Sequence, residues 1–136
     1  MKRFFFLICF ISFSAFSQSN CSEKNCMIVV DSGSTGSRAY LYEYQFSSNN
    51  TPLFIKEISA TRLSPGLSSL ADDKTQIDSY LSQLFSPLKQ DNVILPVYYY
   101  ATAGMRLLSD DQQTAAYHLI EKWFNNNDNA FILKAA

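Results

Sequence analysis

An acidic residue closes a short apolar run and opens directly onto a turn rich in glycine, serine and threonine. The run, residues 27–30, is β-branched and ends at Asp31, and turn signals occupy residues 32–37. From Arg38 to Phe46 aromatic residues recur at every second position, which is the spacing of side chains on one face of a strand. The segment is therefore predicted to be a strand, a tight polar turn and a second strand.

The rest of the chain carries further strand signals. Residues 53–63 predict a third strand after the turn at residues 49–52. Residues 93–102 predict a buried fourth strand, which tolerates a proline near its beginning. Residues 130–134 predict a fifth.

Two helices are expected between these later strands. The first begins at Asp72 or Asp73 and ends or kinks at Pro87. The second begins with a capping box formed by Ser109 and Gln112. Their apolar faces consist of Ile77, Leu81, Leu84 and Leu88 in the first helix, and of Ala116, Leu119 or Ile120, and Trp123 in the second.

The resulting α/β element order is β-β-β-α-β-α-β. Three antiparallel strands come first, and right-handed crossovers then place the fourth and fifth strands beside the first, parallel to it. This order resembles one lobe of the ribonuclease H-like, actin-like ATPases. Because the carboxyl ends of parallel neighbours share one edge of the sheet, Asp31 and Thr102 are expected to emerge side by side.

The N-terminus has the composition of a secretory signal peptide. Met1-Lys2-Arg3 is basic, and no charge interrupts residues 4–16. This apolar stretch of about 13 residues is shorter than the roughly 17–25 that span a bilayer. We expect a signal peptide over residues 1–17, cleaved between Ser17 and Gln18, and an exported protein without a stable membrane span. An uncleaved N-terminal anchor is the alternative.

Export changes what the cysteines imply. Cys9 leaves with the signal peptide, and the N-terminal segment 18–26 keeps Cys21 and Cys26. In an oxidising compartment a local disulfide between these two is expected, and pairing with a different chain is the alternative.

Composition argues against two other classes of function. The chain has 11 Lys and Arg against 12 Asp and Glu, so no basic excess is available for a nucleic-acid partner. With 3 Cys and 1 His, it has too few ligands for a zinc ribbon or a multi-histidine metal site.

The turn after the first strand has the chemistry of an anion site. Its glycines let backbone N–H groups converge on a phosphate. The hydroxyls of Ser34, Thr35 and Ser37 can add donors, and Asp31 can hold a divalent cation or its waters. It is not a Walker loop, because the Gly-Lys-Ser/Thr ending is missing. Taken alone, the same residues also fit an ordinary polar hairpin turn.

A second small-residue segment, residues 100–108, follows the fourth strand. Its small side chains permit close backbone approach, and Thr102 offers a hydroxyl at the sheet edge where ligands gather in α/β proteins. The alternative is a tight strand-to-helix joint with Arg106 as a solvated or structural cation.

Together these segments resemble a known enzyme family. Residues 31–38, Asp-Ser-Gly-Ser-Thr-Gly-Ser-Arg, resemble the first motif of the nucleoside triphosphate diphosphohydrolases (ecto-apyrases and guanosine diphosphatases). Residues 101–108, Ala-Thr-Ala-Gly-Met-Arg-Leu-Leu, resemble the second, and residues 65–69 resemble the loop between them. The resemblance covers residues 27–136. It implies metal-dependent hydrolysis of nucleoside tri- and diphosphates in a cleft between two actin-like lobes.

The resemblance also implies a role for each matched residue. Asp31 would hold Mg or Ca through water molecules, and Thr102 would position the metal or the attacking water. Gly33, Gly104 and Arg106 would support the two motifs. Phosphate binding would fall to Ser34, Thr35, Gly36, Ser37 and Arg38.

Two of the family's motifs have no counterpart in this sequence. The third carries the glutamate that activates water, and the fourth opens the second lobe. Residues 131–136 have the composition of an interrupted strand. Residues 27–136 are therefore expected to be a first lobe truncated at its C-terminus, inactive without the missing C-terminal lobe. The alternatives are a nucleotide- or phosphate-binding module without hydrolysis, and an actin-fold phosphatase of the exopolyphosphatase type.

Overall fold

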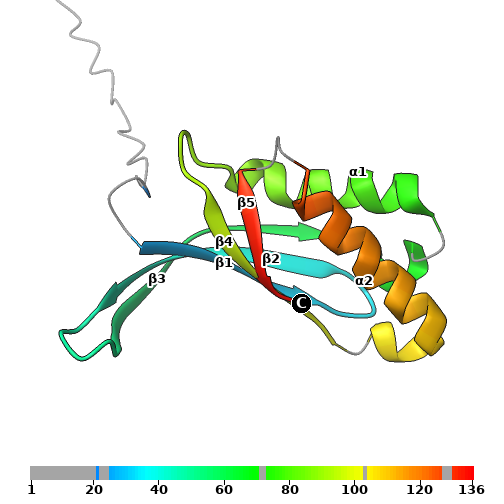
Figure 1. The fold of residues 1–136 in the computed structure, drawn as a ribbon, viewed down its shortest axis with the longest axis horizontal. Helices are drawn as coiled ribbons and strands as arrows, with labels where there is room; N and C mark the ends of the chain where they lie inside the picture. The colour runs from blue at the N-terminus through cyan, green and yellow to red at the C-terminus, as the bar shows by residue number, and fades with distance from the viewer. Residues whose placement is uncertain (1–20, 22–24, 71–72, 103, 127–129) are drawn as a thin grey trace, which may run out of the picture.

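The computed structural model describes residues 21, 25–70, 73–102, 104–126 and 130–136. In this part of the chain one five-stranded sheet carries two long helices on one side (Figure 1). The strands and long helices are β1 (Asn25–Ser32), β2 (Ser37–Phe46), β3 (Pro52–Leu63), α1 (Lys74–Phe85), β4 (Leu95–Ala101), α2 (Asp110–Phe124) and β5 (Phe131–Ala135). Short 3-10 turns lie at η2 (Leu67–Leu70), η3 (Ser86–Leu88) and η4 (Met105–Leu107).

The predicted strand order is confirmed. The sheet runs β3-β2-β1-β4-β5. β1 pairs antiparallel with β2, and β2 antiparallel with β3. β1 pairs parallel with β4, and β4 parallel with β5. The carboxyl end of β1 therefore lies beside that of β4, as the crossover argument requires.

The helices cover one face of the sheet, and the hydrophobic core lies between the helices and this face. Along β1 the alternation of side chains buries Ile28, Val30 and Ser32 on the helical side, because successive residues of a strand point to opposite faces. Pro87 ends the first helix in η3, as predicted, while Leu88 stays buried. The predicted capping box at the start of α2 is also present.

An aromatic cluster joins both helices to β5. Phe85 of α1 stacks on Trp123 of α2 with ring centroids 5.3 Å apart. Phe85 also contacts Phe124 and Phe131, at 5.2 Å in each case. These contacts fix the helical layer against the last strand.

The opposite face of the sheet is rich in tyrosine. Tyr40, Tyr42 and Tyr44 of β2 are half-buried there, and Tyr40 and Tyr42 stack with centroids 5.9 Å apart. The predicted aromatic face of this strand is thus confirmed, but it lies away from the helices.

Several strand boundaries differ from the prediction by one or two residues, and those at the end of β1 and the start of β2 matter for the turn. β1 continues through Asp31 to Ser32, because Ser32 still pairs with Ser37 across the hairpin. The connecting turn therefore shrinks to residues 33–36. β4 begins at Leu95 and not at residue 93, because its pairing with β5 starts at Leu95.

Some predictions fall outside the described residues. The signal peptide over residues 1–17 and its cleavage site are among them, as is Asp72, one of the two expected starts of the first helix. Asp73 is the N-cap of α1, and its carboxylate accepts hydrogen bonds from the Thr75 and Gln76 backbone N–H groups. In the described part of the chain, neither helix is both long and apolar enough to cross a membrane.

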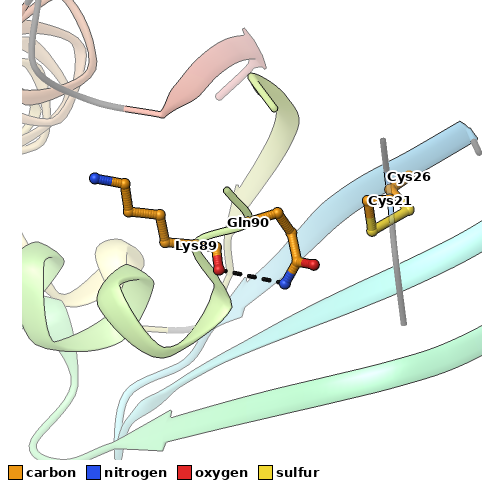
Figure 2. Close-up of a disulfide and its surroundings, with 4 residues drawn as sticks. All are labelled: Cys21, Cys26, Lys89 and Gln90. Carbon is orange, nitrogen blue, oxygen red and sulfur yellow. Dashed lines mark hydrogen bonds between the residues drawn. A yellow bond between two sulfur atoms is a disulfide. The ribbon is translucent and has the colours of Figure 1, made fainter. Parts of the chain in front are cut away.

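The expected local disulfide is present. Cys21 is bonded to Cys26 beside the start of β1 (Figure 2). Both residues are buried, at 3% and 6% exposure. The bridge fastens the chain before β1 at the end of that strand remote from the 33–36 turn.

Removing this disulfide is expected to destabilise the fold only modestly. Substitution of both cysteines by alanine should lower the free energy of unfolding by about 2 kcal/mol, because closing so short a loop removes little entropy from the unfolded chain. Urea unfolding followed by circular dichroism measures the change. The single variant Cys21→Ala should match the double variant, and a loss well above 3 kcal/mol would contradict the entropic account.

Candidate phosphate and metal site

The four-residue turn between β1 and β2 is closed by a backbone hydrogen bond. The Gly33 N–H donates to the Gly36 carbonyl oxygen at 2.9 Å. Just below the turn, the hydroxyls of Ser32 and Ser37 are hydrogen-bonded at 2.7 Å, and both residues are buried. The turn is thus fixed at its base on both strands.

Ser37 occupies a different position from the one its expected role suggests. Its side chain points to the helical face of the sheet and bonds Ser32. The alternation along β2 could have revealed this, because Ser37 has the same parity as the buried Ala39 and Leu41. Ser34 and Thr35, in contrast, are exposed on the turn.

A buried tyrosine lies beneath the serine pair. Tyr99 of β4 is fully buried, and its hydroxyl lies near Ser32 and Ser37 without completing a hydrogen bond to any described residue. Burial raises the pKa of Tyr99 to about 12. The neighbouring Ser32 and Ser37 hydroxyls lower this pKa, but their effect is smaller than that of burial. Tyr99 therefore stays protonated at physiological pH and acts as packing beneath the turn.

The second motif meets the first at the edge of the sheet. Parallel pairing sets Asp31 beside Tyr100, and Ser32 beside Ala101. The Thr102 N–H then donates to the Ser32 carbonyl oxygen at 2.9 Å. The Thr102 hydroxyl donates to a carboxylate oxygen of Asp31 at 3.5 Å. The predicted side-by-side arrangement of Asp31 and Thr102 is confirmed.

Glycines let two neighbouring segments press against the turn. A Cβ built on Gly104 would lie 2.8 Å from the Gly33 carbonyl oxygen and 3.0 Å from the Ser34 Cα. A Cβ on Gly66 would lie 2.5 Å from the same Gly33 oxygen. Since real Cβ atoms essentially never come so close to a neighbour, both positions require glycine. The loop at residues 65–69, which resembles the segment between the two motifs in the enzyme family named above, thus packs on the turn through Gly66.

A pocket of about 200 Å³ opens beside the turn, on its β2 and β3 side. It contains most of the predicted phosphate-binding residues, whereas Ser34, Thr102, Gly104 and Arg106 do not line it. Arg106 is exposed in η4. The lining consists of Asp31, Gly33, Thr35, Gly36, Ser37, Arg38, Arg62, Leu63 and Ser64.

Three of these lining residues, Arg62, Leu63 and Ser64, were not anticipated. They lie outside both motifs, at and just after the end of β3. Antiparallel pairing sets Arg62 directly opposite Arg38. Placing these residues beside the turn requires the pairing register of β3 against β2. That register shifts at an irregularity between Leu41 and Tyr42.

The donor set suits a hard divalent cation held largely by water and phosphate. Asp31 offers an exposed carboxylate, with the Thr102 hydroxyl beside it. Among the described residues there is no cluster of three or more His, Cys, Asp or Glu that could enclose a metal. A single carboxylate completed by waters and substrate oxygens is a common way of binding Mg²⁺. The residues present therefore fit such an ion at Asp31.

Comparison with known proteins places these motifs in a family. Residues 17–135 match the model of the GDA1/CD39 (nucleoside phosphatase) family. The chain is 30% identical to the nucleoside-diphosphatase mig-23 of Caenorhabditis elegans over 104 residues, covering 68% of this chain and 19% of the relative. It is 35% identical to ectonucleoside triphosphate diphosphohydrolase 7 of Mus musculus, covering 67% and 17%. This chain thus spans about a fifth of the length of these relatives.

A solved structure supports the fold. The nucleoside triphosphate hydrolase structure from Neospora caninum aligns with a TM-score of 0.52 at 12% sequence identity. The alignment covers 82% of this chain and 29% of that chain. The architecture is the actin-like α/β lobe expected from the element order. Because the family model matches residues 17–135 and the two motifs meet at one edge of the sheet, the chain belongs to the GDA1/CD39 (nucleoside phosphatase) family.

Proposed function

We propose that this chain forms the phosphate-binding part of an exported phosphohydrolase that acts on nucleoside tri- and diphosphates. The observation that carries the proposal is the meeting of Asp31 and Thr102, from two separate motifs, at 3.5 Å beside the 33–36 turn. Membership of a nucleoside phosphatase family supports the reaction class, and the relatives' names supply the substrates.

The turn and its neighbours provide the donors for the terminal phosphates. Ser34 and Thr35 are exposed on the turn, and their hydroxyls, together with backbone N–H groups of the turn, would cradle a phosphate. Arg38 adds a positive charge from β2. With its hydroxyl bonded to Ser32, Ser37 takes part through its backbone and by holding the turn in shape.

Asp31 and Thr102 form the metal- and water-positioning side of the site. Asp31 would hold Mg²⁺ or Ca²⁺ through water, and Thr102 orients the Asp31 carboxylate and presents its hydroxyl to the water shell. A bound cation neutralises phosphate charge as the terminal phosphoryl group is transferred to water. Gly104 lets its segment lie against Gly33 where the two motifs meet, whereas the supporting role of Arg106, which is exposed in η4, stays a prediction.

The described lining of the pocket holds one carboxylate. Among the described residues that line it, Asp31 is the only acid, and the proposal assigns Asp31 to the cation. No lining group is then left to take the proton from an attacking water. We therefore propose that these residues bind and orient the phosphates, and that the general base belongs to a second lobe.

The purified 136-residue chain should accordingly bind nucleotide without hydrolysing it. Incubation with ATP or ADP and either Mg²⁺ or Ca²⁺ is expected to release no phosphate above background in a colorimetric assay. Calorimetric titration with ADP and Mg²⁺ tests binding in the same preparation. Turnover well above background would contradict the assignment of the base to another lobe, and the absence of any binding would contradict the proposed function itself.

Export is the setting we propose for this activity. The Cys21–Cys26 disulfide fits an oxidising compartment, and one of the relatives is named an ectonucleoside enzyme. The basic and apolar composition of residues 1–17 fits a signal peptide. Secretion of a fusion beginning with residues 1–17, with cleavage after Ser17, is the direct test.

A binding module without hydrolysis is the second candidate. The single carboxylate of the pocket favours it. Calorimetry separates the two, because a dedicated module should bind nucleotide at micromolar levels by itself, whereas one wall of a larger cleft should bind it more weakly. Competition by inorganic polyphosphate tests the exopolyphosphatase-like alternative.

A further inference from the structure

Arg62 lies outside both motifs, yet it lines the same pocket as the turn. The strand register pairs Asp31 with Arg38 and Arg38 with Arg62. Paired residues of neighbouring strands share one face of a sheet. The three side chains therefore form one charged row across β1, β2 and β3, on the face opposite the helices.

The charges of this row do not balance. Two guanidinium groups directly opposite each other repel, and Asp31 can compensate only one of them. In the part of the chain that the structure describes, neither Arg38 nor Arg62 makes an ion pair or a side-chain hydrogen bond, and both are exposed. The pocket therefore keeps a positive charge in excess and favours an anion.

The spacing of the row indicates which anion fits. Asp31 and Thr102 lie at the β1–β4 side, whereas Arg62 lies two strands away on β3. Two strand spacings separate the backbones of Asp31 and Arg62 by about 10 Å, so a cation held at Asp31 and the guanidinium of Arg62 would contact different phosphate groups of one anion. An anion with two or more linked phosphates can lie against the turn at one end and reach Arg62 at the other.

We infer that Arg62 binds the phosphate next to the one held by the turn, and thereby selects linked phosphates over a single phosphate. This inference rests on the proposed function, because it takes the turn to be the site of the terminal phosphate. A guanidinium suits this role, since its planar fork of donors matches two phosphate oxygens. Free pyrophosphate and the diphosphate of a nucleotide share the chemistry that Arg62 would recognise.

Calorimetric titration of the chain with pyrophosphate and with orthophosphate, at a fixed excess of Mg²⁺, tests the assignment. The parent chain should bind pyrophosphate at least 10-fold more tightly than orthophosphate. Arg62→Gln should weaken pyrophosphate binding by about 10- to 100-fold, because a charge-assisted pair is lost, and change orthophosphate binding by less than about twofold. Arg62→Lys should fall between the two, since it keeps the charge without the fork.

Lys56→Gln is the matched control. It removes the same charge from an exposed position on the same strand, where Lys56 pairs with Glu43, and it should leave both affinities unchanged. Parallel titrations with ADP and AMP show whether the effect holds for nucleotides or only for inorganic pyrophosphate.

The outcomes separate this inference from the proposed function. If the parent chain prefers pyrophosphate and Arg62→Gln keeps that preference, the assignment of Arg62 is overturned while the proposed function stands. If the parent chain binds none of these phosphates, both are overturned.

Discussion

Replacing Gly66 with alanine is expected to weaken the binding of phosphate ligands by more than about 100-fold. The added Cβ would lie 2.5 Å from the Gly33 carbonyl oxygen and 2.6 Å from the Ser34 carbonyl carbon. Both contacts are with backbone atoms, which cannot rotate away as a flexible side chain could. The turn would have to shift as a unit, and a displacement of about 1 Å in a positioning element can cost that much.

Calorimetry with pyrophosphate measures the loss, and thermal unfolding measures the accompanying strain of about 1–3 kcal/mol. Gly33→Ala is the matched control for stability. A Cβ on Gly33 would meet only the Gly36 carbonyl oxygen, at an ordinary 3.7 Å, and no described glycine has a positive φ that alanine would disfavour. If Gly66→Ala bound pyrophosphate like the parent chain, the turn would not be the phosphate site.

Asp31→Asn is expected to remove most of the Mg²⁺-dependent part of ligand binding. The change keeps the shape and the neighbouring Thr102 hydroxyl but replaces the carboxylate that, among the described residues, alone lines the pocket. Because a neutral amide attracts a divalent cation far less than a carboxylate does, ADP affinity in excess Mg²⁺ should fall on the order of 100-fold. In an enzyme completed by its second lobe, most of the activity should be lost.

Titration with ADP, once in excess Mg²⁺ and once in a chelator, isolates the contribution of the cation to binding affinity. The parent chain should lose affinity in chelator, and Asp31→Asn should bind similarly in both. Asp91→Asn, at an exposed turn position before β4, removes the same charge and should behave like the parent chain. An Asp31→Asn variant that keeps the Mg²⁺ response would refute the metal role of Asp31.

The topology and the meeting of the two motifs were predictable because each follows from a local signal. Period-two aromatic residues marked β2, the capping box at Ser109 marked α2, and the handedness of crossovers then fixed which strands are neighbours. The contact between Asp31 and Thr102 is a consequence of that neighbour relation. Predicting this contact required no knowledge of side-chain packing.

The remaining features depend on register and close packing, which no local signal encodes. Where the turn closes decides whether Ser37 belongs to β2 and so shares the parity of Ala39 and Leu41, and the pairing of Ser32 with Ser37 shortened the turn by a residue at each end. Arg62 enters the pocket through the register of β3, which includes an irregularity. The need for glycine at position 66 becomes visible only when its loop lies against Gly33.

The aromatic cluster between the helices and β5 gives the chain an internal optical reporter. Trp123 is the single tryptophan of the sequence, and its indole N–H donates to the Ser82 hydroxyl at 3.3 Å within that cluster. Its neighbours come from α1, α2 and β5, and it does not line the anion pocket. Tryptophan fluorescence therefore follows the integrity of the helical layer, and it should stay unchanged when a ligand occupies the anion pocket.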